Sequence, residues 1–145
     1  MRVAARSRPD VLGLLVAVGL TPAVVYADDL NARVAAANET RGQLLFLQCK
    51  ACHDVTPALP HKVGPNLNGV IGRKAGTVSG FQFSESMRNS GLTWDLATLD
   101  AFLRQPGALV PGSGMAFAGV ASDADRASLL RYLQKAAPLP SPVAP

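Results

Sequence analysis

The pattern of hydrophobic and polar residues along this chain predicts helices and no strands. The first helix is expected over residues 39–51, where the run Leu44-Leu45-Phe46-Leu47 supplies one buried stripe. Asn38 or Thr40 is expected to cap its N-terminus. The preceding residues 28–38 are polar and rich in alanine, and we interpret them as a leader into the folded domain.

Two further main helices are expected in the second half of the chain. One begins near residue 95 and stops before Pro106, because the residue ahead of a proline avoids helical geometry. The other begins at the acidic segment 122–125 and ends near residue 135. Their apolar faces consist of Leu96, Leu99, Phe102 and Leu103 in the first helix and of Leu129, Leu130, Tyr132 and Leu133 in the second. A short helical turn is expected over residues 84–89, ended by Ser90-Gly91.

A long ordered loop is expected between the first helix and this turn. Residues 54–80 contain five glycines and three prolines and show little periodicity. The fold class is therefore all-α, with three main helices joined by long loops. Because the apolar residues alone would make only a thin core in a domain of this size, a buried prosthetic group would supply much of the missing apolar volume.

The two ends of the chain are expected to lie outside the folded domain of residues 39–136. Residues 1–27 are predicted to be a secretory signal peptide, since arginines precede an apolar run and Val25-Tyr26-Ala27 fits a signal peptidase site. The run is shorter than the roughly 20 apolar residues that span a bilayer, which favours cleavage over retention as an anchor. The proline-rich residues 137–145 are predicted to be disordered.

The charge balance indicates neither a nucleic-acid partner nor an anionic membrane surface. The whole chain carries a net charge of +4, and cleavage after Ala27 would remove three arginines and one aspartate and leave +2. We therefore expect no nucleic-acid binding and no stable membrane insertion after cleavage. Export to an oxidising compartment such as the bacterial periplasm also agrees with the cysteine content, because the only two cysteines belong to one motif and no free cysteine is left over.

The pentapeptide Cys49-Lys50-Ala51-Cys52-His53 carries the strongest functional signal. C-x-x-C-H is the attachment site of a c-type haem. Cysteines three residues apart on one helical turn face the same side, so each sulfur of Cys49 and Cys52 can bond one vinyl-derived carbon of the porphyrin. His53 can then place its imidazole beneath the iron as the proximal ligand.

Two other uses of these residues compete with haem attachment. A structural zinc site needs four ligands, and the chain offers only Cys49, Cys52, His53 and His61. A thioredoxin-like redox pair would need a strand before the cysteines, and no convincing strand pattern precedes them. Both uses are less favoured than haem.

Met115 is the candidate for a second axial ligand. It lies in the loop of residues 110–119, between the second and third main helices. A thioether is a soft ligand, and His/Met ligation raises the reduction potential of haem iron. The alternative is that Met115 fills the core, as most methionines do, but its flanking glycines argue against a helical core position.

Several motifs in order resemble class I cytochrome c, the family of the mitochondrial electron carrier and its soluble bacterial relatives. The resemblance covers residues 41–135. Besides the C-x-x-C-H site and the loop around Met115, its segments are Gly42-Gln43-Leu44-Leu45-Phe46, Gly64-Pro65-Asn66-Leu67-Asn68-Gly69, Gly72-Arg73-Lys74, Gly91-Leu92-Thr93-Trp94 and residues 126–133. The resemblance implies a small fold wrapped around one covalently bound haem c with its iron.

The resemblance also implies roles for individual residues. The carbonyl of Pro65 would accept a hydrogen bond from His53 and fix the orientation of this ligand. Trp94 and Arg73 would lie around a buried haem propionate, where Arg73 compensates a charge that is costly to bury unpaired. Phe117 would pack beside the exposed haem edge. His61 matches a histidine that ties loops together.

Departures from the mitochondrial members predict a drier pocket and a different docking face. Phe83 and Phe102 stand where those members carry tyrosines, and Met87 occupies a position that often holds asparagine. We infer a shifted reduction potential. Of the lysines around the haem edge, the chain clearly keeps Lys62, so docking should be more apolar and only weakly dependent on salt.

Together these features predict a periplasmic one-electron carrier, and not an enzyme, that cycles haem iron between Fe(II) and Fe(III) with His53 and Met115 as axial ligands. Its partners would be redox proteins, namely donor and acceptor cytochromes, oxidases or dehydrogenases, and we expect a monomer. One alternative is a haem enzyme or gas-binding sensor with an open distal site. Another is a dedicated electron-transfer subunit of one dehydrogenase or oxidase.

Overall fold

The computed structural model describes residues 22–138, with side chains from residue 29 onward. The predicted signal peptide up to residue 21 and the predicted tail from residue 139 lie outside the described residues. Six helices form the described part: α1 (Pro22–Ala36), α2 (Glu39–Lys50), α3 (Glu85–Asn89), α4 (Leu96–Arg104), α5 (Pro106–Leu109) and α6 (Asp123–Ala136). No strand occurs among them, and the one β-bridge joins Lys74 to Thr93. The predicted all-α class is confirmed.

The expected helices begin at side-chain caps. Asn38 accepts a hydrogen bond from the backbone N–H of Arg41 at the start of α2, and Ser122 caps α6 in the same way. Ser84 and Asp95 cap α3 and α4. Because a cap satisfies a backbone donor that the helix cannot, these polar residues fix where each helix begins, within one or two residues of the prediction.

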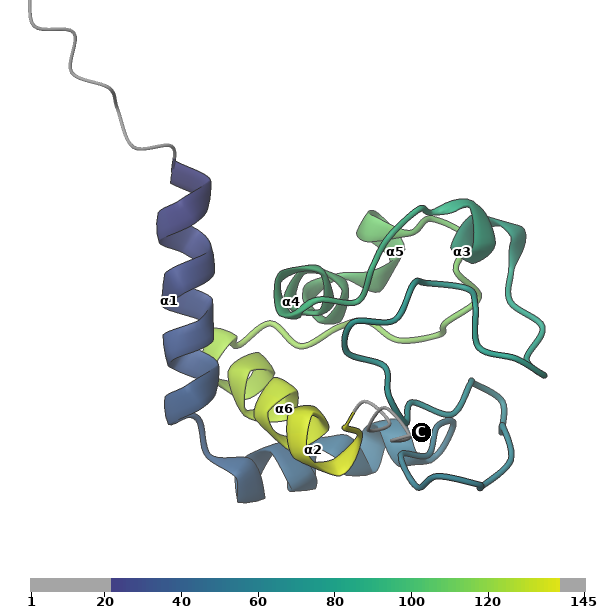
Figure 1. Cartoon of the computed structure of the whole chain (residues 1–145), viewed down its shortest axis with the longest axis horizontal. Helices are drawn as coiled ribbons and strands as arrows, with labels where there is room; N and C mark the ends of the chain where they lie inside the picture. Colours follow the sequence, from purple (N-terminus) through teal and green to yellow (C-terminus); the bar gives the residue numbers. More distant parts are fainter. Residues whose placement is uncertain (1–21, 139–145) are drawn as a thin grey trace, which may run out of the picture.

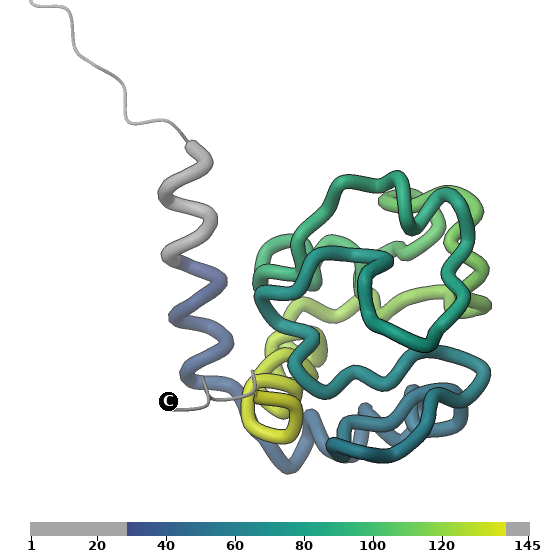
Figure 2. The backbone as a smooth tube through the Cα atoms, turned by 45° about the vertical axis from the view of Figure 1, so that its right-hand side comes forward, coloured from purple at the N-terminus to yellow at the C-terminus, as the bar shows by residue number. Residues whose placement is uncertain are grey.

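Among the described helices, α2 and α6 make the most extensive contact where they cross (Figure 1). The rings of Phe46 and Tyr132 pack there, with centroids 5.2 Å apart. Residues 51–84 run from the end of α2 to α3 as a long loop along one side of the molecule (Figure 2). This loop contains no helix, as the glycines and prolines predicted.

The expectation for the apolar run in α2 is partly wrong. Phe46 is buried, but the side chains of Leu44 and Leu47 are 57% and 59% exposed. These two residues are three apart on the outer face of α2, so the helix that buries Phe46 must turn them toward solvent. Four consecutive apolar residues span more than one face of a helix, and only part of such a run can be buried.

Two helices were not expected. Pro106 ends α4 as predicted, but it also occupies the first turn of α5, where a proline is well tolerated. Residues 28–38, interpreted as a leader, lie mostly in α1, which packs against α4 and α6. Leu30 and Val34 of α1 are 2% and 1% exposed, so this segment contributes to the hydrophobic core. The predicted cleavage site after Ala27 lies within this helix.

A buried ion pair joins α4 to α6. Arg126 is fully buried, and its Nε donates to Asp100 Oδ1 at 2.8 Å. The same guanidinium donates to the carbonyls of Val120 and Ala121 and to the carboxylate of Asp123. These partners compensate a charge that would otherwise be costly to bury.

Within residues 22–138 no helix has the length and hydrophobicity needed to cross a bilayer.

Candidate haem-binding site

A cavity of about 410 Å³ lies among α2, α4, α6 and the long loops. Its volume falls in the range that is usual for ligand and cofactor sites. All eight site residues named from the sequence line it: Cys49, Cys52, His53, Pro65, Arg73, Trp94, Met115 and Phe117. The structure therefore brings together residues that are up to 68 positions apart in the chain.

The attachment segment continues the last turn of α2. The backbone N–H groups of Cys52 and His53 both donate to the carbonyl of Cys49, at 3.0 and 2.8 Å. This turn brings the sulfurs of both cysteines to the wall of the cavity, and they form no disulfide with each other. Burial and, to a smaller extent, the nearby Cys52 together raise the pKa of the Cys49 thiol to about 11.

The imidazole of His53 is held in one orientation. Its Nδ1 lies 2.7 Å from the carbonyl oxygen of Pro65, which can only accept, so Nδ1 carries the proton and Nε2 remains available to a metal. Burial lowers the pKa of His53, although the hydrogen bond to Pro65 opposes this effect. The ring packs against Gly64, where an added Cβ would lie 2.3 Å from His53 Cε1.

Arg73 and Trp94 form another part of the cavity wall. Arg73 donates to the carbonyls of Asn68 and Asn66 at 2.9 and 3.3 Å, and burial lowers its pKa. Both acceptors are uncharged, so the guanidinium retains a positive charge that a propionate would compensate. Trp94 is 8% exposed and packs on Phe102, with ring centroids 4.9 Å apart. The residues present therefore fit a haem with its carboxylates.

Met115 and Phe117 reach the cavity from the loop between α5 and α6. Gly112 and Gly114 in this loop have φ values of +75° and +79°, a conformation that favours glycine. Most of the remaining lining is apolar and includes Phe83, Phe102 and Met87, the three departures named from the sequence. Its polar members are Gln48, Gln82, Ser84 and Ser113. Sequence reasoning missed further lining residues. Helical spacing marks Leu99, Leu129 and Leu133 as core without showing which cavity they face, and Val70 lies in a loop without periodicity.

His61 lies outside this lining and ties two parts of the long loop of residues 51–84 together. Its Nε2 donates to the carbonyl of Ser79 at 2.8 Å, and its Nδ1 accepts from the backbone N–H of Asn66 at 2.9 Å. Both ring nitrogens are thus used by the backbone. In the part of the chain that the structure describes, no group of three or more His, Cys, Asp and Glu residues could hold a metal ion, which disfavours the zinc alternative.

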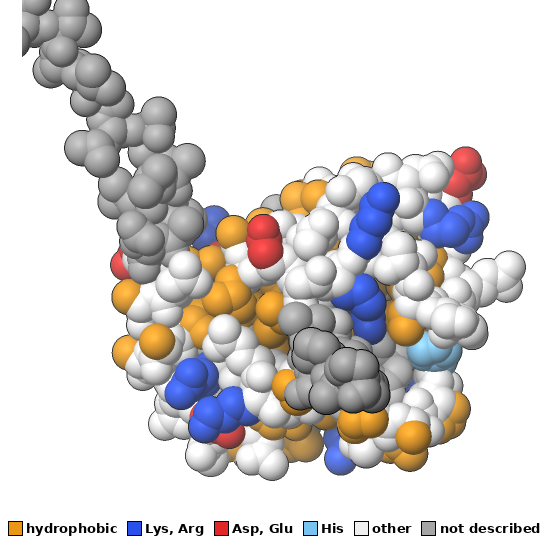
Figure 3. All heavy atoms as spheres, viewed as in Figure 1, with side chains coloured by type: hydrophobic (Ala, Val, Ile, Leu, Met, Phe, Trp, Pro, Cys, Tyr) orange, Lys and Arg blue, Asp and Glu red, His pale blue; other side chains and the backbone are white. Residues whose placement is uncertain are grey.

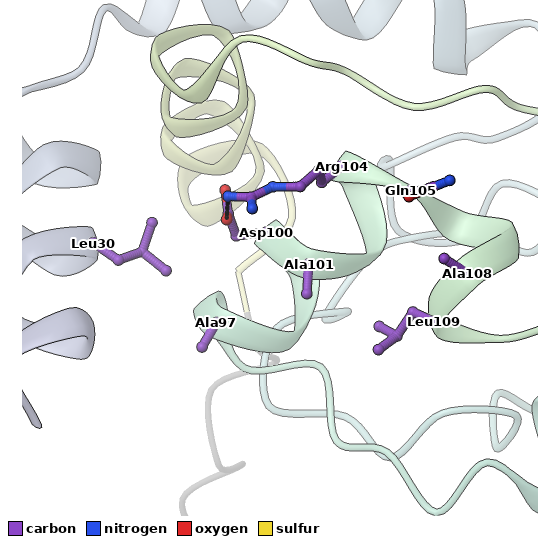
Figure 4. Close-up of a pocket in the computed structure, with 8 residues that line it drawn as sticks. All are labelled: Leu30, Ala97, Asp100, Ala101, Arg104, Gln105, Ala108 and Leu109. Carbon is purple, nitrogen blue, oxygen red and sulfur yellow. Dashed lines mark ion pairs between the residues drawn. The ribbon is translucent and has the colours of Figure 1, made fainter. Parts of the chain in front are cut away.

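A second hollow of about 340 Å³ lies between α1, α4 and α5 (Figure 4). Alanine and leucine side chains form most of its wall, and its two charged residues, Asp100 and Arg104, pair with each other at 3.6 Å. None of the eight predicted site residues lines it. The cysteines border the larger of the two cavities, which is therefore the candidate haem site.

Comparison with known proteins agrees with this geometry. Residues 39–137 match the family model described as cytochrome c. The chain belongs to the cytochrome c family. It is 48% identical over 99 residues to a cytochrome c2 from Rhodomicrobium vannielii, covering 68% of this chain and 79% of that protein. It is 45% identical over 100 residues to a cytochrome c2 from Rhodoblastus acidophilus, covering 69% and 94%.

A third relative, a cytochrome c-550 from Bradyrhizobium diazoefficiens, is 39% identical over 94 residues, which cover 65% of this chain and 69% of that protein. As a cytochrome c, the chain carries one haem c, attached through Cys49 and Cys52. The haem iron supplies the one-electron chemistry of the family, and the protein supplies attachment, orientation and electrostatics.

Proposed function

We propose that this cytochrome c is a periplasmic one-electron carrier whose haem iron is held by His53 Nε2 and the sulfur of Met115. The observation that carries this proposal is the meeting of the two side chains in one cavity, although they are 62 positions apart in the chain. Pro65 orients His53, and two glycines shape the loop of Met115. Iron held by both side chains would leave no open position for a substrate, which supports a carrier over an enzyme or gas sensor.

Periplasmic location is supported by the sequence of residues 1–27 and by the attachment motif. The arginine-rich start, the apolar run and the pattern at residues 25–27 fit an exported precursor. The test is the N-terminal sequence of the protein purified from the periplasmic fraction of an expressing bacterium. A chain that begins at Asp28 supports the proposal, and one that retains residues 1–27 in the membrane fraction contradicts it.

The mouth of the cavity supports docking to redox proteins through an apolar surface. Val63 lines the cavity with its side chain 82% exposed, and Phe117 lines it half-buried. On the face shown in Figure 3, basic and acidic side chains are interspersed with uncharged and apolar surface. Electron-transfer rates with the natural partner should therefore fall little with added salt, and a steep fall would contradict this part of the proposal.

The decisive test of the ligand set is the absorbance spectrum of the oxidised exported protein. A red-edge sulfur-to-iron charge-transfer band is expected, and Met115→Ala should abolish it. Met87 lines the same cavity, so Met87→Leu is the matched control and should keep the band. A band that survives Met115→Ala, or rapid carbon monoxide binding by the unmutated reduced protein, would favour a haem enzyme or gas sensor. Copurification with one large enzyme would favour a dedicated subunit.

A further inference from the structure

The side chain of Lys62 is engaged with the haem-attachment segment. Its Nζ donates to the carbonyl of Lys50 at 3.0 Å and to the carbonyl of His53 at 3.2 Å. It also lies 3.3 Å from Asp54 Oδ2. An ammonium group has three N–H donors, and here three acceptors surround it. Although 37% of its side chain is exposed, Lys62 therefore directs its donors to acceptors of the protein, on the residues that flank and include the proximal ligand.

The backbone around Lys62 makes the same connection. Its own N–H donates to the carbonyl of Gly64 at 3.0 Å, and the N–H of Gly64 donates to the carbonyl of Cys52 at 2.8 Å. The next residue, Pro65, accepts from His53 Nδ1. One short segment, residues 62–65, thus holds the attachment turn by its backbone, by a charged side chain and through the imidazole.

The charge of Lys62 has a consequence for the iron. Fe(III) carries one more positive charge than Fe(II), so a nearby ammonium group favours the reduced state. Asp54 offsets this effect, because its side chain is only 10% exposed and pairs with the ammonium.

We propose that Lys62 positions the proximal ligand and does not dock to acidic partners. Lys62 clamps residues 50–54 to the Pro65 segment, and its charge raises the reduction potential. This inference rests on the proposed function, because it assumes that His53 ligates the iron. It differs from what the sequence predicted for Lys62, which was a docking position kept from the mitochondrial pattern.

The test compares Lys62→Gln with Lys62→Arg and Lys74→Gln in the holoprotein. Lys74 is exposed, so Lys74→Gln removes the same charge outside the clamp. We expect Lys62→Gln to lower the reduction potential. It should also speed the solvent exchange of the His53 Nδ1–H about fivefold, the factor that corresponds to the net free energy of one hydrogen bond. Lys62→Arg should restore the potential at least partly. Lys74→Gln should leave both properties unchanged.

A second variant keeps the proposal testable if Lys62→Gln does not fold. Asp54→Asn removes the negative partner and should shift the potential in the opposite direction, upward. The proposal is overturned if Lys62→Gln leaves potential and ring N–H exchange unchanged but reduces the salt dependence of electron transfer to the partner, since that is the behaviour of a docking lysine. The charge-transfer band is recorded in every sample: its absence from the unmutated protein would contradict the His53/Met115 ligand set, while ring N–H exchange still reports on the clamp.

Discussion

Gly42 of α2 lies directly against the backbone of Ser128 in α6. A Cβ added at Gly42 would stand 2.0 Å from the Ser128 carbonyl oxygen and 2.8 Å from Tyr132 Cβ. No side chain fits at that separation, so glycine is what lets the two helices cross this closely. Because α2 ends at the attachment cysteines and α6 carries Leu129 and Leu133 of the cavity wall, this crossing sets one dimension of the haem pocket.

The change Gly42→Ala should therefore destabilise the protein by about 1–3 kcal/mol or more, the usual cost of overpacking. The free energy of unfolding of the holoprotein in urea measures this loss. Gly107→Ala is the matched control, because nothing lies within 4 Å of the Cβ it would add in α5. Equal stability of the two variants would show that α2 and α6 separate without cost.

The change Gly64→Ala should disturb the proximal ligand. Its new Cβ would lie 2.3 Å from His53 Cε1 and 2.7 Å from Nδ1, so the imidazole must move away from Pro65. We expect a lower yield of haem-containing protein and a lower reduction potential in what is recovered, since a poorly oriented ligand binds the iron less well. Visible absorbance and potentiometry measure both quantities. An unchanged potential would indicate that the loop, and not the ligand, absorbs the added methyl group.

Breaking the buried pair of Arg126 and Asp100 should be costly. Asp100→Leu leaves a fully buried guanidinium without its 2.8 Å partner, and we expect a loss of about 3–5 kcal/mol in the free energy of unfolding. The double variant Asp100→Leu with Arg126→Met should lose less than Asp100→Leu alone, because it removes the uncompensated charge. If the double variant loses as much as the sum of both single changes, the pair does not act as a unit.

The ion pair between Arg41 of α2 and Asp125 of α6 predicts a pH dependence of stability. The hydrogen bond from Arg41 Nε, at 2.9 Å, holds the pKa of the Asp125 carboxyl below its usual value. A carboxyl whose pKa is lower in the folded state than in the unfolded chain stabilises the fold. This stabilisation is complete at pH values above the unfolded pKa of about 3.9, and it is lost as the pH falls through the pKa of the folded state.

Asp125→Asn should accordingly lower the melting temperature slightly at pH 7 and not at a pH below the folded pKa. The effect is small because the Arg41 side chain is half-exposed and solvent screens the pair. Melting curves between pH 7 and pH 2 measure the difference between the two proteins. A difference that stays constant over this range would assign the loss to something other than the charge of Asp125.

The core role of α1 predicts that shortening Leu30 is costly. Leu30 is 2% exposed, and Leu30→Ala should lower the free energy of unfolding by about 2–5 kcal/mol, as for other leucines in protein cores. Its neighbour Asn31 is exposed, so Asn31→Ala is the control and should have little effect. A neutral result for Leu30→Ala would mean that α1 is not part of the stable fold.

Most helix boundaries could be predicted because they depend on local chemistry. Asn38, Ser84, Asp95 and Ser122 each cap a helix with their own side chain, and that preference is visible in the sequence. α1 could not be predicted, because Leu30 and Val34 are too few to make a periodic pattern in an alanine-rich segment. Its burial is decided by surfaces of α4 and α6 that are distant in the chain.

The candidate site, too, could be predicted from the sequence only in part. Cys49, Cys52 and His53 form a contiguous motif, so their meeting in one cavity is fixed by spacing. The hydrogen bond of His53 to Pro65 was expected only from the resemblance to the family, and the structure has this contact at 2.7 Å. The clamp by Lys62 had no sequence signal, because a lysine is ordinarily solvated and its partners are backbone carbonyls, which every residue carries.

The cavity bordered by the attachment turn also has a consequence for biosynthesis. Nine of the seventeen buried hydrophobic residues face it. Without the prosthetic group, these side chains would face about 410 Å³ of space open to solvent instead of packing against apolar atoms, and much of the hydrophobic core would be missing. The newly exported polypeptide should therefore stay unfolded until both thiols have reacted. The enzymes that attach the prosthetic group should act on a flexible chain, and folding should be the last step of maturation.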